Sequence, residues 1–123
     1  WNEARSRAAC LYDEMLAPIE GVVLPPGSRD ETHVWHIYAV RVAERDRVLA
    51  ELHGAGVGAG IHYPNPIHRL GSYAFLGHRV GDFPRAESAA AEMISLPIFP
   101  GITTGQQERV ASLLAGAVAK GRS

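Results

Sequence analysis

The feature that most constrains the fold is the stretch at residues 33–42, where apolar and aromatic residues occupy both alternating faces. One face carries Val34, His36, Tyr38, Val40 and Val42, and the other carries His33, Trp35, Ile37, Ala39 and Arg41. This period of two predicts a β-strand. Because both faces are partly apolar, we expect a central strand that helices cover on at least one side.

Four stretches have the three- and four-residue spacing of apolar side chains that is typical of amphipathic helices. They are residues 1–17, residues 44–53, residues 83–94 with Asp82 as the cap, and a last helix that begins after Thr103 or Thr104. Either threonine has a glutamine three residues later, which is the spacing of a capping box. The apolar face of the last helix consists of Val110, Leu113, Leu114, Ala117 and Val118.

Shorter β-type runs are expected at residues 21–25 and 58–63, and residues 96–100 form an extended segment between prolines. The order of these elements predicts an α+β fold, in which helices pack on one face of a small, mostly antiparallel sheet. The chain has 123 residues, of which 46% are hydrophobic and 20% are charged. We therefore expect residues 1–123 to form a single domain.

Charge and cysteine content narrow the choice of partner and compartment. A formal net charge of −1 favours neither a nucleic acid nor a membrane surface as a partner. No apolar run reaches the roughly 18 residues of a membrane span, and no signal peptide is recognisable. The single cysteine, Cys10, cannot form an internal disulfide and is interpreted as a small core residue. We expect a cytoplasmic protein, and since the chain opens with Trp1 we do not expect residue 1 to be the natural start.

The basic residues are eleven arginines and one lysine, Lys120, which lies close to the end of the chain. Chain ends are commonly poorly ordered. Chemistry that requires a buried and precisely placed lysine is therefore not expected from this chain alone.

Several motifs that would indicate a familiar chemistry are incomplete. The glycine-rich run at 54–60 lacks the third glycine of a dinucleotide-binding loop and follows a helix, so it is interpreted as a helix end and a tight turn. His33 and His36 would point in opposite directions on a strand, and no second cysteine joins them. No metal site is therefore predicted, although a small zinc-dependent domain is kept as an alternative.

The segment HYPNPIH at 62–68 is the clearest candidate for a ligand site. It places two imidazoles, a phenol and an amide on a loop that Pro64 and Pro66 make stiff. Rigid loops at strand ends commonly present ligand-binding groups. The residue types fit equally well a proline-rich turn whose polar groups satisfy one another, and both interpretations remain open at this point.

At this loop the sequence resembles the C-terminal part of the DegT/DnrJ/EryC1/StrS family of sugar-nucleotide aminotransferases. The matching motifs are HVWHIY at 33–38, GAGIHYP at 58–64, PIH at 66–68, FPRAE at 83–87, SLPIFP at 95–100 and the glutamines at 106–107. Their order and spacing agree from residue 1 to about residue 115.

The resemblance implies the small C-terminal domain of a fold type I enzyme that uses pyridoxal 5′-phosphate (PLP), with residues 1–17 as the end of the interdomain helix. Such an enzyme transfers an amino group, usually from glutamate, to a keto-sugar carried on a nucleotide, and the resemblance implies a homodimer. The resemblance also implies that His62, Tyr63 and His68, and more weakly Asn65, contact the nucleotide-linked sugar. Lys120 does not match the family's Schiff-base position, so no catalytic residue is assigned and the chain alone is expected to be inactive.

The alternative is a binding module without catalysis, which holds a nucleotide sugar or a protein partner. If the chain is instead part of a longer enzyme, we expect the first helix and the face of Trp35 or Val34 to keep exposed apolar area.

Overall fold

The computed structural model describes residues 1–27 and 32–121. Helix α1 (Asn2–Leu16) is followed by strands β1 (Val22–Val23) and β2 (Tyr38–Val42) and by helix α2 (Arg45–Gly54). Two short 3₁₀ helices, η1 (Ile67–Arg69) and η2 (Gly71–Leu76), precede helix α3 (Pro84–Glu92), strand β3 (Met93–Leu96) and helix α4 (Thr104–Lys120).

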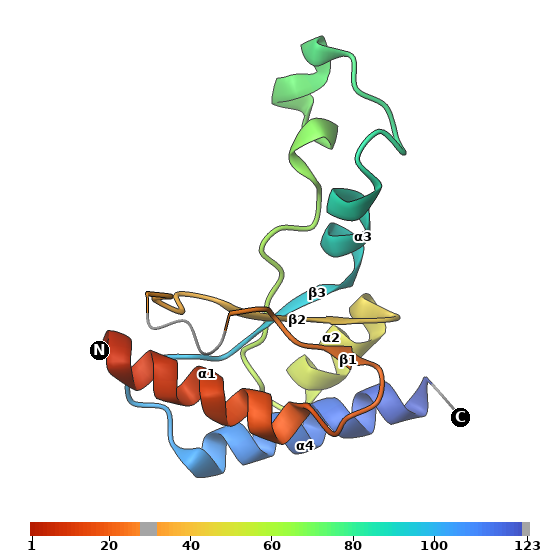
Figure 1. Ribbon diagram of the computed structural model, residues 1–123. Helices are drawn as coiled ribbons and strands as arrows, with labels where there is room; N and C mark the ends of the chain where they lie inside the picture. Colours follow the sequence, from red (N-terminus) through yellow and green to blue (C-terminus); the bar gives the residue numbers. More distant parts are fainter. Residues whose placement is uncertain (28–31, 122–123) are drawn as a thin grey trace.

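The strands form one antiparallel sheet with the order β1-β2-β3. Tyr38 lies opposite Leu96, and Val22 lies opposite Val42. Helices α1, α2 and α4 lie on one side of this sheet, where α4 contacts both other helices (Figure 1). The predicted α+β architecture, with an antiparallel sheet covered on one face by helices, is confirmed.

The core lies between the sheet and these three helices. Tyr38, Val40 and Val42 are buried and alternate with half-buried residues, as the period of two in this part of the sequence predicts. Ile94 and Leu96 pair with β2 on the same face. The helices contribute buried side chains that recur at helical spacing: Ala8, Ala9, Tyr12, Leu16, Val48, Leu52, Val110, Ala111, Leu114, Ala117 and Val118.

Three buried polar side chains connect α1 to the rest of the fold. The Tyr12 hydroxyl donates a hydrogen bond to the Pro97 carbonyl at 2.6 Å, and the Tyr38 hydroxyl donates to Asp13 Oδ1 at 2.6 Å. Gln107 Nε2 donates to the Ala8 carbonyl at 2.7 Å. Burial raises the pKa of both tyrosine hydroxyls, and the hydrogen bond with Asp13 raises the pKa of Tyr38 further.

The predicted strand at 33–42 is wrong in its first half, because β2 begins only at Tyr38. Trp35 has a positive φ of 49°, which interrupts an extended backbone. The His33 ring stacks on the indole with centroids 3.8 Å apart, and His33 Nδ1 accepts a hydrogen bond from the Trp35 backbone N–H. This local turn brings the indole to 1% exposure, so of the two residues expected to keep exposed apolar area Trp35 is buried and Val34 is exposed.

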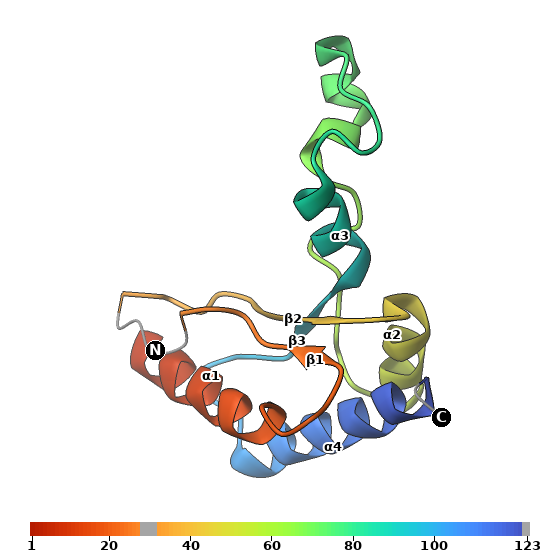
Figure 2. The ribbon, with the colours of Figure 1, turned by 45° about the vertical axis from the view of Figure 1, so that its right-hand side comes forward.

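The predicted strand at 58–63 is reduced to a single bridge between Gly60 and Ser95. Their backbone groups exchange two hydrogen bonds, of 3.0 and 2.8 Å. Beyond Gly60 the chain leaves the sheet, and residues 61–92 form an extension that we call the arm. Figures 1 and 2 show the arm rising from the sheet on the side opposite α1 and α4.

The predicted helix at 83–94 ends earlier, at Glu92, because Met93 pairs with Arg41 and the chain continues as β3. Asp82 does not cap this helix; its Oδ2 accepts a hydrogen bond from the Arg79 backbone N–H at 2.7 Å, and Phe83 occupies the cap position. Pro84 lies in the first turn of α3, where a backbone N–H would have no partner within the helix, so the N–H that proline lacks is not lost from the helix.

Helix α4 begins as the capping-box spacing predicts, with Thr103 rather than Thr104 at the cap. Thr103 Oγ1 accepts from the Gln106 backbone N–H, and Gln106 Oε1 accepts from the Thr103 backbone N–H. Replacing Thr103 with alanine should lower the free energy of unfolding by about 1 kcal/mol, because one helix N–H loses its partner. Urea unfolding measures this loss. Thr104→Ala is the control, and an equal loss in that variant would contradict the assignment of the cap.

Candidate functional site

His62 and Tyr63 lie at the base of the arm, directly after the Gly60–Ser95 bridge, and both are exposed. His62 Nδ1 lies 2.9 Å from Ser95 Oγ, and this hydrogen bond fixes the imidazole relative to β3. The Tyr63 ring meets the His62 ring edge-on, with centroids 5.7 Å apart. Because Nδ1 is engaged, Nε2 is the ring nitrogen that can bind a ligand, and Tyr63 as a residue is 73% exposed.

His68 lies further along the arm, in η1, and its side chain is only 6% exposed. Its ring packs against Phe83 with centroids 4.9 Å apart. Its Nε2 atom lies 3.3 Å from Glu87 Oε1, which is close enough for an ion pair when the imidazole is protonated. The geometry does not make a hydrogen bond, so Nε2 is a buried polar atom without a hydrogen-bond partner among the described residues.

A cavity of about 320 Å³ opens beside His68. It is lined by aromatic and aliphatic side chains together with two imidazoles, from Ile67, His68, Tyr73, Leu76, His78, Phe83 and Ala86. The structure thus divides the predicted site residues into two groups: His68 lines this cavity, whereas His62 and Tyr63 lie outside its lining. Asn65 is exposed between the two prolines and does not line the cavity.

Sequence reasoning missed Tyr73, His78 and Phe83 as cavity residues. The available signal was the density of aromatic and histidine side chains in residues 73–83, a stretch that has neither helical nor strand periodicity. Such a stretch carries no indication of which residues meet in space. Glu87 brings the segment together, because both of its carboxylate oxygens accept from the Gly81 backbone N–H at 2.9 Å.

The arm carries most of the exposed large apolar side chains of the described residues. They are Tyr63, Ile67, Leu70, Tyr73, Phe75, Leu76, Val80 and Phe83. Val34 is exposed as expected, and so is Trp1, the first residue of the predicted first helix. The apolar surface of the domain lies chiefly on the arm.

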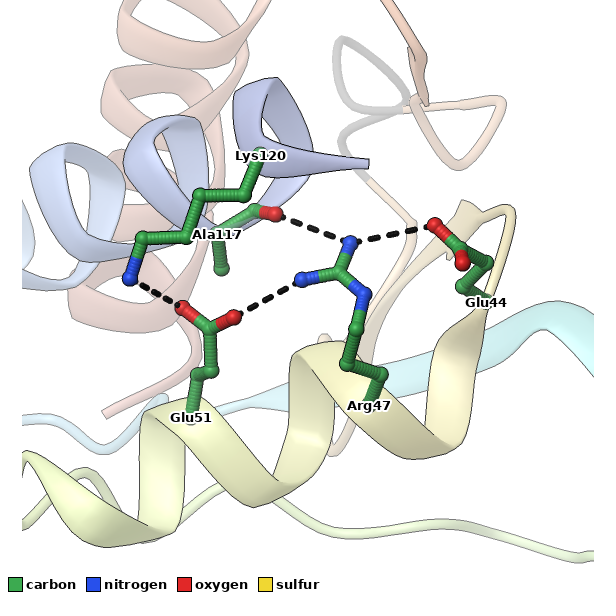
Figure 3. Close-up of polar contacts among 5 residues, drawn as sticks. All are labelled: Glu44, Arg47, Glu51, Ala117 and Lys120. Atoms are coloured by element: carbon green, nitrogen blue, oxygen red, sulfur yellow. Dashed lines mark hydrogen bonds and ion pairs between the residues drawn. The ribbon is translucent and has the colours of Figure 1, made fainter. Parts of the chain in front are cut away.

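Lys120 is the last residue of α4. Helix α4 lies on the opposite side of the sheet from the arm (Figures 1 and 2). Its Nζ atom lies 3.0 Å from Glu51 Oε2, and the other Glu51 oxygen accepts from Arg47 Nη1 at 2.7 Å (Figure 3). Arg47 Nη2 also donates to Glu44 and to the Ala117 carbonyl, which joins α2 to α4. The hydrogen bond from Lys120 lowers the pKa of Glu51.

This placement bears on the cofactor that the resemblance implies. PLP in such enzymes is attached to a lysine amine, but the amine of Lys120 is paired with a carboxylate on the helical face. The described residues therefore do not fit a PLP site. Within residues 1–27 and 32–121, no group of three or more His, Cys, Asp or Glu side chains could hold a metal ion. No described helix is long and apolar enough to cross a membrane.

Comparison with known proteins places these features in a family. The model of the DegT/DnrJ/EryC1/StrS aminotransferase family matches residues 1–115. The chain is 40% identical over 118 residues to the erythromycin biosynthesis sensory transduction protein EryC1 of Saccharopolyspora erythraea, covering 95% of this chain and 32% of that protein. It is 39% identical over 110 residues to the dTDP-3-amino-3,4,6-trideoxy-alpha-D-glucose transaminase of Streptomyces venezuelae, covering 89% of this chain and 29% of that protein.

The same relationship holds in three dimensions. The crystal structure of S. venezuelae DesV in complex with a ketimine intermediate superposes with a TM-score of 0.88 at 37% identity, covering 94% of this chain and 31% of DesV. The chain thus spans about a third of the length of the relatives that it matches. Its three-stranded sheet and helices have the fold found in this part of fold type I PLP enzymes. The chain belongs to the DegT/DnrJ/EryC1/StrS aminotransferase family.

Proposed function

We propose that the chain is the substrate-contacting C-terminal domain of a PLP-dependent aminotransferase that acts on nucleotide-linked keto-sugars. The observation that carries the proposal is the exposed His62–Tyr63 pair at the base of the arm, in which Ser95 holds the His62 imidazole and the Tyr63 ring meets that imidazole edge-on. An imidazole and a phenol both offer hydrogen bonds to sugar hydroxyls and phosphate oxygens. Holding the imidazole in place before the ligand arrives reduces the entropy lost on binding.

The position of the Lys120 amine indicates which functions belong to this domain and which belong to the rest of the enzyme. Because Lys120 pairs with Glu51 on the helical side of the sheet, the lysine that holds PLP is assigned to a part of the enzyme outside residues 1–123. The present domain then provides substrate contacts and no amine. In this proposal residues 1–17 are the end of an interdomain helix, the amino donor is glutamate, and the whole enzyme is a cytoplasmic homodimer.

The experiment is steady-state kinetics of the longer enzyme that contains this domain. His62→Ala should raise KM for the nucleotide-linked sugar by about ten- to a hundredfold, because one hydrogen bond to a charged group contributes about 1.5–3 kcal/mol. The KM for the amino donor should change little. His36→Ala removes an exposed imidazole outside the arm and is the matched control.

Two results would contradict the proposal. An unchanged KM in His62→Ala would remove the assigned role of the base of the arm. A longer protein that binds nucleotide-linked sugars but transfers no amino group would favour the binding module instead.

A further inference from the structure

We propose that residues 67–83, which we call the outer arm, are a docking surface for the rest of the enzyme. The partner is an apolar surface edged by carboxylate groups, in the part of the longer enzyme outside residues 1–123. This inference rests on the proposed function and names a protein partner for the arm. It is carried by uncovered apolar side chains, by an apolar cavity and by two exposed guanidinium groups.

The outer arm has no core of its own. It projects from the sheet, away from α1 and α4 (Figures 1 and 2), and within residues 67–83 only His68 is buried. Its backbone forms η1 and part or all of η2, yet its large apolar side chains remain exposed: Ile67, Leu70, Tyr73, Phe75, Leu76, Val80 and Phe83. Ordering such a segment costs conformational entropy, and burying these side chains against a partner offsets that cost.

The cavity beside His68 gives this surface a shape that a partner can fill. The cavity has a volume of about 320 Å³, and Ile67, Tyr73, Leu76 and Phe83 of the exposed apolar set line it. The lining contains no arginine, lysine or carboxylate. An apolar side chain of the partner suits this cavity, whereas a charged side chain would lose its hydration there without compensation. Protein interfaces commonly place an anchoring side chain in a pocket of this kind.

Charge indicates what borders the apolar surface of the partner. Arg69 and Arg79 are exposed, and neither guanidinium group forms a hydrogen bond or an ion pair with the described residues. Asp82, the acidic residue of the outer arm, is already engaged: its Oδ2 accepts from the Arg79 backbone N–H at 2.7 Å and lies 3.7 Å from His78 Nδ1. Because both free guanidinium groups are positive, the complementary partner surface carries carboxylates.

A second arm, a membrane or a nucleic acid fits these features less well. Two arms in contact would bring guanidinium groups together while Asp82 is engaged elsewhere. Membrane-surface segments are typically amphipathic helices rich in basic residues, whereas η2 spans only Gly71–Leu76. Two arginines are few for a phosphate backbone. The rest of the enzyme is a partner of ample size, because the chain spans about a third of the length of its relatives.

The first test is amide hydrogen exchange, followed by mass spectrometry on the longer enzyme that contains this domain. Phe75→Ser should make exchange in residues 67–83 at least about tenfold faster. Phe75 is 81% exposed in the domain, so a loss of protection there reports contact with the partner. Phe99→Ser is the matched control, because Phe99 is an exposed phenylalanine outside the arm, and exchange in residues 67–83 should stay unchanged.

The second test addresses the carboxylates of the partner. Arg79→Lys places an amine at this position, and a carbodiimide then joins that amine to a carboxylate in direct contact. The cross-link in the longer enzyme should lead to a carboxylate outside residues 1–123. Arg79→Glu should accelerate exchange in the outer arm at least about threefold, because the reversed charge repels those carboxylates. Arg7→Glu reverses an exposed charge on α1 and should not accelerate it.

Several outcomes would overturn the docking surface. They are unchanged exchange in Phe75→Ser, equal acceleration by Phe99→Ser, and an Arg79→Lys enzyme whose cross-links are absent or end within residues 1–123. If protection of the outer arm requires vesicles that contain phosphatidylglycerol, the partner is a membrane and the proposal is wrong. The KM of His62→Ala tests the proposed function separately, so either proposal can fail while the other stands.

Discussion

Replacing Arg45 with methionine should lower the free energy of unfolding by about 2–4 kcal/mol. The Arg45 side chain is buried, and its Nη1 atom donates to the carbonyls of Ala90 at 2.8 Å and Met93 at 3.0 Å. The first of these carbonyls is in the last turn of α3, where carbonyl groups lack a partner within the helix. Methionine keeps much of the volume but leaves both carbonyls without this donor.

The same substitution should loosen the attachment of the arm. Arg45 joins the start of α2 to the point where α3 gives way to β3, and Arg41 adds two bonds to Glu92 nearby, at 3.0 and 2.8 Å. Amide hydrogen exchange in α3 should therefore become faster in Arg45→Met than the change in global stability accounts for. Urea unfolding gives the global value.

Arg85→Met is the matched control, because Arg85 is an exposed residue on α3. It should change the free energy of unfolding by no more than about 0.5 kcal/mol. If both variants lose the same stability, or if Arg45→Met loses none, Arg45 does not hold the end of α3.

The stability of the fold should fall steeply in alkaline solution because two buried tyrosines must stay neutral in the folded state. Burial raises the pKa of Tyr12 and Tyr38 above the ordinary value of 10.0. In the unfolded chain both phenols lose a proton near that ordinary value, so above it the folded state binds more protons. Their contribution is fully present below about pH 10 and is lost as the pH rises toward the folded-state pKa values.

Each such group lowers the free energy of unfolding by up to about 1.4 kcal/mol per pH unit, and the two together by up to about 2.7. Urea unfolding at pH values on both sides of about 10 measures the slope. Tyr38→Phe should reduce the slope by about half, because one of the two phenols is gone. At neutral pH this variant should also lose about 1–3 kcal/mol, because Asp13 loses its hydrogen-bond donor.

Tyr63→Phe, which removes an exposed phenol, serves as the control and should keep the wild-type slope. Comparing slopes between variants removes the contribution of the other groups that titrate in this range. A slope in Tyr38→Phe equal to that of the wild type would mean that the Tyr38 hydroxyl is accessible to ionisation in the folded state.

Helix α4 shows which parts of the fold local sequence could predict. Its start depends on Thr103 and Gln106, which are three residues apart, and its buried face follows one regular period through Val110, Leu114 and Val118. Helices α1 and α2 were predicted for the same reason, with ends that differ by one residue. The interactions that define these helices join residues only a few positions apart, so a periodic pattern in the sequence reveals them.

The predictions are wrong mainly where the local structure depends on residues far away in the sequence. The burial of the Trp35 indole depends on core residues from other elements, and the end of α3 depends on the pairing of Met93 with Arg41, which lies far earlier in the chain. The candidate site shows the same limit. The exposed position of His62 and Tyr63 at the end of a sheet segment followed from the two prolines, but the cavity between η1, η2 and α3 depends on contacts that have no periodic signature.

The pairing of Gly60 with Ser95 has a consequence for how this domain can diversify. The segments that leave and re-enter the sheet are hydrogen-bonded to each other at Gly60 and Ser95, and Arg41 and Arg45 bind the end of α3 close to this bridge. Lengthening or shortening the part of the arm between the Gly60–Ser95 bridge and α3 should cost little in loop-closure entropy. This part of the arm can therefore change in length and sequence with little effect on the packing of the sheet and helices.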